Sequence, residues 1–170
     1  MRIIDGPYKK TVRQGAPEGY YNAIFLEVTV RQRENGKDLK KEDVHFDLMT
    51  QEAIRDLMDK TVPDGVVCYH TSHRTHQFYK SLSASAAALG FAYKKAHDRY
   101  PALGLSPEER QKADSSHFSS EWLVIARRVE HLTRLRNRAR MPELTWEVPD
   151  AGDFPAWRDG AEPVMPLAER

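Results

Sequence analysis

Four short apolar runs limit what this chain can fold into more than any other feature of its sequence. They lie at residues 23–26, 66–69, 91–93 and 122–126. Apolar residues that follow one another without alternating polar positions are typical of strands buried on both faces, as in a parallel sheet. The sequence therefore predicts four core strands, which must be connected over the faces of one sheet.

Helical patterns separate the first three runs. Thr50 is a favourable N-cap, and it is followed at helical spacing by apolar residues, namely Ala53, Ile54, Leu57 and Met58. We expect Pro63-Asp64-Gly65 to end this helix. A second helix is predicted over residues 76–89, where small Ser and Ala residues permit close packing on a sheet, with Gly90 as the residue after its C-cap.

This order predicts an α/β fold with a mostly parallel, Rossmann-like sheet, because strands joined by helices form βαβ units. The last two strands lack a helix of similar size between them, so we expect them to pair antiparallel at a sheet edge. The polar stretch 32–43 contains Asn35-Gly36, which is a strong turn signal. It fits either a hairpin or a surface loop leading to the first helix, and we favour the loop.

Length and composition indicate one domain and exclude some functions. The chain has 170 residues, for which we expect a domain over 1–140 and a proline-rich extended tail over 141–170. The net charge of +1, from 26 basic and 25 acidic residues, gives no reason to expect a nucleic-acid partner. There is one cysteine, no apolar run of membrane-spanning length and no signal-peptide pattern at Met1, so we expect a cytoplasmic location.

The order of several motifs resembles bacterial spermidine-synthase-like proteins, some of which are fused to transporter-like membrane domains. Residues 48–53 read Leu-Met-Thr-Gln-Glu-Ala, and residues 63–74 read Pro-Asp-Gly-Val-Val-Cys-Tyr-His-Thr-Ser-His-Arg. Residues 120–127 are similar to the last strand of that family, and 156–159 (Ala-Trp-Arg-Asp) lie where the family has a Trp-Thr-Asp-Asp motif. The resemblance runs from about Arg2 to Asp159.

The resemblance implies a partial class I methyltransferase-like sheet. The family has the strand order 3-2-1-4-5-7-6, and residues 23–27, 66–70, 91 onward and 122 onward correspond to strands 4, 5, 6 and 7. Asp5-Gly6 falls at the turn after strand 3, so Asp5 is a candidate relic of the cofactor site. The first two strands and the glycine-rich turn that lets a nucleoside approach the backbone have no counterpart. We therefore expect no cofactor.

The resemblance also indicates candidate catalytic residues. Aminopropyltransferases carry an acidic segment after strand 4 that helps to deprotonate the attacking amine, and here Glu27 is the acid left in that segment. His70 ends the next strand, where open α/β sheets bind ligands. An alternative for His70, His73 and His76 is a metal site, although we favour a polar turn there.

Two functions follow from this comparison. Without strands 1 and 2, the strand at 23–28 would have an open edge, and such edges invite pairing with another chain. We expect completion by a protein partner, by a second copy or by a rearranged N-terminus, and possible attachment to a membrane complex through the partner. The chain would then be an accessory, non-catalytic domain. The alternative is half of an aminopropyl- or methyltransferase whose nucleoside-binding half belongs to another chain.

Two further features favour structural roles. Arginines are concentrated between residues 127 and 140, and we interpret them as a solvated face beside an acidic tail rather than an anion-binding surface. Cys68 lies within an apolar run, so we expect a buried thiol and not a nucleophile.

Overall fold

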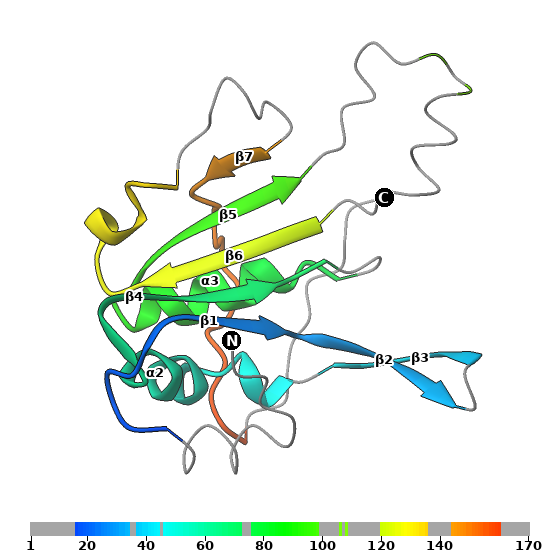
Figure 1. Cartoon of the computed structure of the whole chain (residues 1–170), viewed down its shortest axis with the longest axis horizontal. Coiled ribbons are helices and arrows are strands. Elements are labelled where there is room, and N and C mark those ends of the chain that lie inside the picture. Colours follow the sequence, from blue (N-terminus) through cyan, green and yellow to red (C-terminus); the bar gives the residue numbers. More distant parts are fainter. Residues whose placement is uncertain are drawn as a thin grey trace.

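A computed structural model describes residues 16–34, 37–44, 46–72, 76–98, 106, 108, 120–135 and 144–160 of the chain. Within them the fold is α/β, with two α-helices and two β-sheets (Figure 1). The strands are β1 (Tyr21–Glu27), β2 (Thr29–Glu34), β3 (Lys37–Val44), β4 (Thr61–His70), β5 (Ala92–Asp98), β6 (Ser120–Ala126) and β7 (Leu144–Glu147). The helices are α2 (Gln51–Asp59) and α3 (Phe78–Ala88), with short 3-10 turns η1 (Phe46–Leu48) and η2 (Val129–Leu132).

The main sheet has the strand order β1-β4-β6-β5-β7. β1 and β4 are parallel, whereas β6 is antiparallel to both β4 and β5, and β7 is antiparallel to β5. The expectation of a mostly parallel sheet is therefore wrong, because β6 inserts between two parallel strands and makes both of its ladders antiparallel. The predicted antiparallel pairing of β5 with β6 is confirmed, but β7 forms the edge beyond them.

Residues 29–34 and 37–44 pair as the two strands of a hairpin and do not form the loop that we favoured. β2 pairs antiparallel with β3, from Thr29 with Val44 to Glu34 with Lys37. Two residues, Asn35 and Gly36, separate that last pair along the chain, and this dipeptide favours tight hairpins. The turn signal was therefore stronger evidence than the polar composition of the segment.

The α2 helix begins where the sequence predicts and ends earlier than expected. The Thr50 hydroxyl caps it by accepting a hydrogen bond from the Ala53 backbone N–H at 3.2 Å. Lys60 is the C-cap, so Pro63-Asp64-Gly65 does not end the helix but lies inside β4. Tyr21 of β1 pairs with Thr61 of β4, but Ala23, two residues later, pairs with Val66. The Pro-Asp-Gly segment is therefore an irregularity in β4.

The α3 helix packs closely on the sheet, as its small residues predict. Ser81, Ser83, Ser85 and Ala86 are fully buried. Gly90 follows the C-cap with φ +72°, which confirms its predicted position after the helix end.

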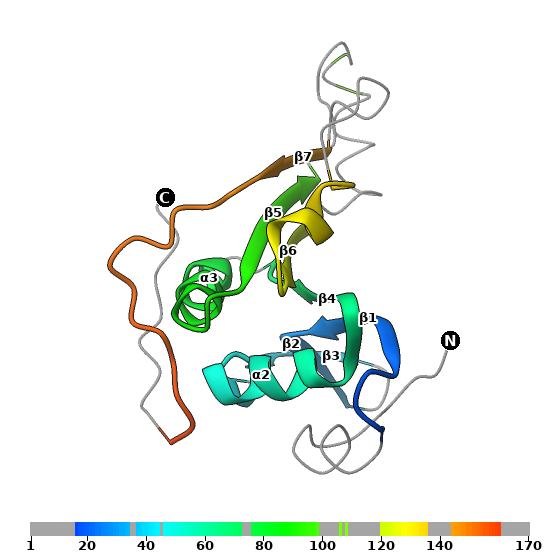
Figure 2. The ribbon, with the colours of Figure 1, turned by 90° about the vertical axis from the view of Figure 1, so that its left-hand side faces the viewer.

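Both helices cover the same face of the main sheet (Figures 1 and 2). The core between the helices and the sheet contains large side chains from alternate positions of the central strands, including Val67, Tyr69, Leu123 and Ile125. The opposite face carries a smaller cluster of Cys68, Val124, Ala126 and Leu132, which the segment after β6 helps to cover. Among the described residues, the larger core therefore lies on the helix side of the sheet.

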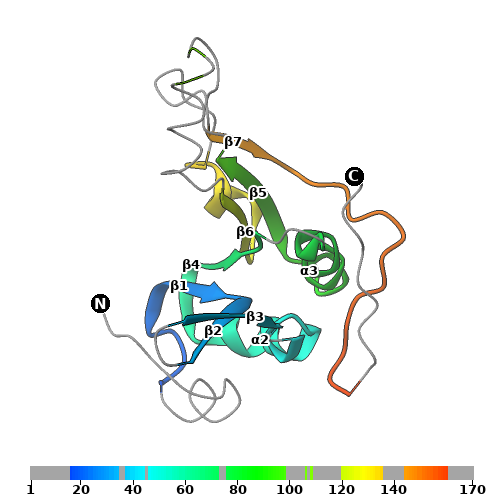
Figure 3. The same cartoon turned by 90° about the vertical axis from the view of Figure 1, so that its right-hand side faces the viewer.

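The segment after β7 belongs to this same core. It runs along α3 towards the start of α2 (Figures 2 and 3). Trp157 is only 4% exposed and packs beside Phe46 with ring centroids 5.9 Å apart. Its backbone N–H donates to Ser85 Oγ at 3.0 Å, and its carbonyl accepts from Gln51 N at 2.8 Å. The segment thus joins both helices. Among the described residues, no helix is long and apolar enough to cross a membrane.

Candidate functional site

The carboxyl ends of β1 and β4 bring Glu27 and His70 together. The two residues are direct partners in the parallel ladder, so their side chains lie on the same face. His70 Nδ1 is 2.8 Å from Glu27 Oε1 and 2.7 Å from Oε2. The structure therefore places the two sequence-predicted catalytic candidates in direct contact.

The chemistry of this pair fixes the role of each imidazole nitrogen. An ionised carboxylate has no hydrogen to donate, so His70 Nδ1 must carry the hydrogen of the shared bond. In the neutral ring, Nε2 is then an acceptor. This is the arrangement in which a carboxylate orients a histidine that acts as a base. The side chains of Glu27 and His70 are 50% and 24% exposed, so solvent reaches the pair.

Two aromatic rings adjoin the pair. The ring of Trp122, the neighbour of His70 on β6, lies 4.7 Å from the imidazole at an angle of 30°. Phe25, two residues before Glu27, meets Trp122 edge-on at 6.2 Å and is itself 70% exposed. The Phe25 ring is therefore largely exposed at the side of the polar pair.

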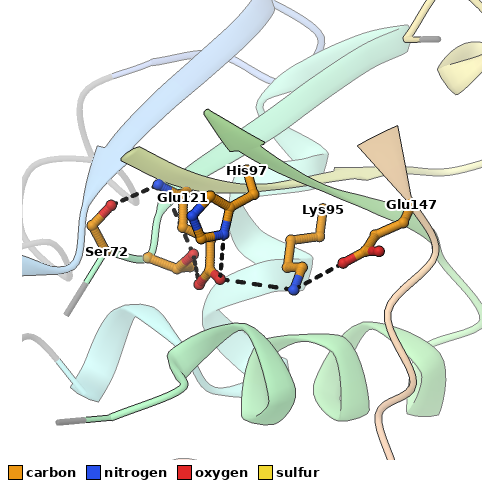
Figure 4. A network of polar contacts seen from close by, with 6 residues as sticks. Ser72, Lys95, His97, Glu121 and Glu147 are labelled. Carbon is orange, nitrogen blue, oxygen red and sulfur yellow. Dashed lines mark hydrogen bonds and ion pairs between the residues drawn. The ribbon is translucent and has the colours of Figure 1, made fainter. Parts of the chain in front are cut away.

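A second polar cluster lies on the helix side of the sheet and was not predicted (Figure 4). Its centre is Glu121 on β6, which accepts a hydrogen bond from the Thr71 hydroxyl at 2.9 Å. Two cationic or titratable groups of β5 approach the same carboxylate: Lys95 Nζ at 3.8 Å and His97 Nδ1 at 3.9 Å. The Glu121 backbone N–H donates to Ser72 Oγ at 2.6 Å.

Burial controls the protonation of Glu121. It raises the pKa of this carboxyl above the ordinary 4.5, whereas the Thr71 hydrogen bond and the charges of Lys95 and His97 oppose the shift. Burial is the larger effect, so the carboxyl holds its proton more tightly than an exposed glutamate does.

A cavity of about 270 Å³ lies beside this cluster. Tyr79 and Lys80 of α3, Lys95 of β5 and the segment from Glu147 to Phe154 surround it. Lys95 is thus shared between the polar cluster and the cavity. The sequence offered one signal, the alternation of Lys95 and His97, but their proximity to Glu121 depends on strand pairing.

The metal alternative gains no support from the described histidines. His70 pairs with Glu27, whereas His76 packs beside Phe78 with ring centroids 5.7 Å apart. His73 and Asp5 lie outside the described residues. Within the part of the chain that the structure describes, no group of three His, Cys, Asp or Glu residues is arranged to hold a metal ion.

Arg127 and Cys68 have structural roles. Arg127 Nη1 donates to Thr61 Oγ1 at 3.0 Å and to Val62 O at 2.8 Å, and Nη2 donates to Met58 O. It therefore bonds the Met58 carbonyl at the end of α2, where the helix dipole favours a cation, and the Val62 carbonyl at the start of β4. Burial raises the pKa of Cys68 to about 12, which confirms the predicted buried thiol.

Comparison of the chain with protein-family models and with curated proteins finds no match.

Proposed function

We propose that this chain is an accessory, spermidine-synthase-like domain that acts by pairing β1 with a strand of a protein partner. The observation that carries the proposal is the position of β1. Among the described residues it is the terminal strand of the main sheet, and Phe25 near its centre is 70% exposed.

The order of the strands supports the resemblance to the class I methyltransferase fold. Under the assignments made from sequence, β1, β4, β6 and β5 correspond to strands 4, 5, 7 and 6. Their spatial order, β1-β4-β6-β5, is then the last part of the family order 3-2-1-4-5-7-6. The insertion of β6 between β4 and β5 is informative, because strands adjacent in sequence usually lie side by side. β7, beyond β5, has no counterpart in that order.

The composition of β1 supports the pairing. Proteins protect exposed sheet edges with lysines, prolines or bulges that prevent association. The sequence of β1, Tyr-Asn-Ala-Ile-Phe-Leu-Glu, has neither lysine nor proline, and its one charge is at the end. In the family order, strands 1 to 3 lie beyond strand 4, so a partner on this edge would take their place.

Site-specific photo-cross-linking tests the proposal. A photoreactive amino acid at Phe25 is expected to give one defined cross-linked product in the organism that expresses the chain, either a second copy or another protein. The matched control is the same amino acid at Val148, which is 68% exposed and lies after β7, at the other end of the sheet. Equal labelling from both positions, or no product from position 25, would contradict the proposal.

A second function is favoured by the Glu27–His70 pair. If the partner carries a nucleoside-binding half, these two residues stand at the carboxyl end of strands 4 and 5, where an aminopropyl- or methyltransferase needs a base. Glu27 would orient His70 through Nδ1, and Nε2 would accept a proton from the attacking group.

Calorimetry distinguishes the two functions. S-adenosylmethionine and its decarboxylated form are titrated into the chain alone and into the chain with its cross-linked partner. An accessory domain binds neither compound in either state. Binding that requires the partner, with turnover lost in both Glu27→Gln and His70→Gln, would replace the accessory function by the half-enzyme.

A further inference from the structure

The cavity beside Lys95 lies on the other face of the sheet from Glu27 and His70. Lys95 is the direct ladder partner of Leu123, which belongs to the core beneath the helices. His70 is the ladder partner of Trp122, the neighbouring residue on β6, whose side chain points to the opposite face. A ligand in this cavity would therefore be independent of the function proposed above.

Lys95 is a cation held in a largely desolvated position. Its side chain is 12% exposed, and Nζ lies 4.0 Å from the ring centroid of Tyr79. Removing an ammonium group from water is costly unless an anion compensates for it. Glu121, whose pKa is raised, is 3.8 Å away and compensates only in part.

Glu147 supplies the closer anion, and it does so from the cavity side. Its Oε1 lies 2.9 Å from Lys95 Nζ, although the Glu147 side chain is 59% exposed. The pair is visible in Figure 4, with Glu147 approaching Lys95 from β7. An exposed carboxylate gains little from such a pair, because water solvates it almost as well. Exchanging Glu147 for another carboxylate would therefore cost little.

The rest of the cavity has apolar side chains beside its polar ones. Tyr79 and Phe154 contribute rings, and Val148 and Pro149 contribute aliphatic surface. Lys80 adds a second cation, with Nζ 5.1 Å from the Phe154 ring centroid. The volume of about 270 Å³ is just below the usual range for ligand pockets, roughly 300–1,000 Å³, and so suits a small molecule.

We propose that this cavity binds a small organic monocarboxylate with an apolar or aromatic body, whose carboxylate replaces Glu147 on Lys95. A single negative charge matches a one-for-one exchange with the Glu147 carboxylate. A dianion such as inorganic phosphate would bring a second negative charge next to Asp150, which also borders the cavity.

Benzoate is a suitable probe, with uncharged benzamide and inorganic phosphate as ligand controls. Binding to the intact chain is measured by calorimetry and by ¹⁵N-resolved NMR titration. We expect benzoate to bind about tenfold more tightly than benzamide or phosphate, the factor that one charge-assisted hydrogen bond supplies. Glu147→Gln removes the internal competitor and should tighten benzoate binding severalfold. Glu130→Gln, at an exposed position on η2, is the matched control and should leave the affinity unchanged.

Two lysine variants complete the test. Lys95→Met keeps the length of the buried side chain and should abolish the preference for benzoate over benzamide. Lys80→Gln, at the second lysine of the cavity, should weaken benzoate binding by a smaller factor even if Lys95→Met proves unstable. Equal affinity for benzoate and benzamide, no tightening in Glu147→Gln, or no benzoate binding by either the wild type or Glu147→Gln would each overturn the proposal.

Discussion

Thr50 and Asp159 lie 109 residues apart in sequence, and the Thr50 hydroxyl donates a 2.8 Å hydrogen bond to Asp159 Oδ1. The same threonine caps α2 through Ala53 N. Asp159 N also donates to Glu52 Oε2 at 2.9 Å. The end of the described chain is thus fastened to the first turn of α2, where a negative charge is favourable.

Replacing Asp159 by alanine should therefore destabilise the fold. Loss of the hydrogen bond to Thr50 and of the charge near the helix N-terminus should reduce the free energy of unfolding by about 1 kcal/mol. Urea unfolding monitored by circular dichroism measures the change. Asp153→Ala, at an exposed position of the same segment, is the control and should change stability little. A similar loss in both variants would show that the contact with Thr50 is not the cause.

Glu121→Gln should alter how stability depends on pH. The native pKa of Glu121 lies above 4.5, so the unfolded chain releases this proton first as the pH rises from 4.5. The wild type then loses stability until the native pKa is passed, whereas the glutamine variant does not. The groups facing this carboxyl are Lys95 and His97, which favour its ionisation, and Glu147, which opposes it.

The difference in unfolding free energy between Glu121→Gln and the wild type should change with pH in one direction. Relative to the wild type, Glu121→Gln gains stability as the pH rises from 4 to 7, and the difference stays constant below about 4, where the carboxyl is protonated in both states. Thermal unfolding across this range provides the measurement. A variant that instead loses relative stability towards pH 7 would show that ion pairing with Lys95 outweighs burial.

Cys68 should be inert in the native protein. Its pKa of about 12 leaves a negligible fraction of thiolate at pH 8, and the side chain is buried. Ellman's reagent should therefore label the thiol only when the chain is unfolded, for example in guanidinium chloride. Rapid stoichiometric labelling of the folded chain would contradict the assigned burial.

Arg127→Met should be among the more destabilising single changes at a partly exposed position. The guanidinium donates hydrogen bonds to the carbonyl oxygens of Met58 and Val62. Loss of these hydrogen bonds should lower the free energy of unfolding by about 2 kcal/mol. Arg128→Met, at the adjacent exposed residue, keeps the same change in charge without those contacts. Equal urea midpoints for the two variants would rule out the capping role.

The sequence predicted those helices and strands that are specified by residues close to one another along the chain. Thr50 and the spacing of Ile54 and Leu57 identified α2, and the apolar runs identified the four core strands. Glu27 and His70 could also be identified from the sequence as candidate site residues, because each ends a strand of the predicted parallel pair. Adjacent carboxyl ends of parallel strands must lie at the same edge of the sheet.

Features that depend on strand order were not predictable in this way. The cluster around Glu121 exists because β6 lies beside β5, which places His97 directly opposite Glu121. No local pattern specifies that register. β7 was not predicted because prolines at 142 and 149 suggested an extended tail. The four residues of β7 lie between these prolines and are enough for an edge strand, where missing N–H donors are tolerated.

The insertion of β6 between β4 and β5 also determines when the protein can fold during synthesis. β4 is complete at residue 70 and β5 at residue 98, but the strand that joins them ends at residue 126. A nascent chain therefore emerges from the ribosome with two strands that have no shared neighbour until β6 follows. Such long-range closure slows folding and exposes unpaired edges to aggregation. The vulnerable period for this chain is the synthesis of the residues between β5 and β6, when chaperone binding would matter most.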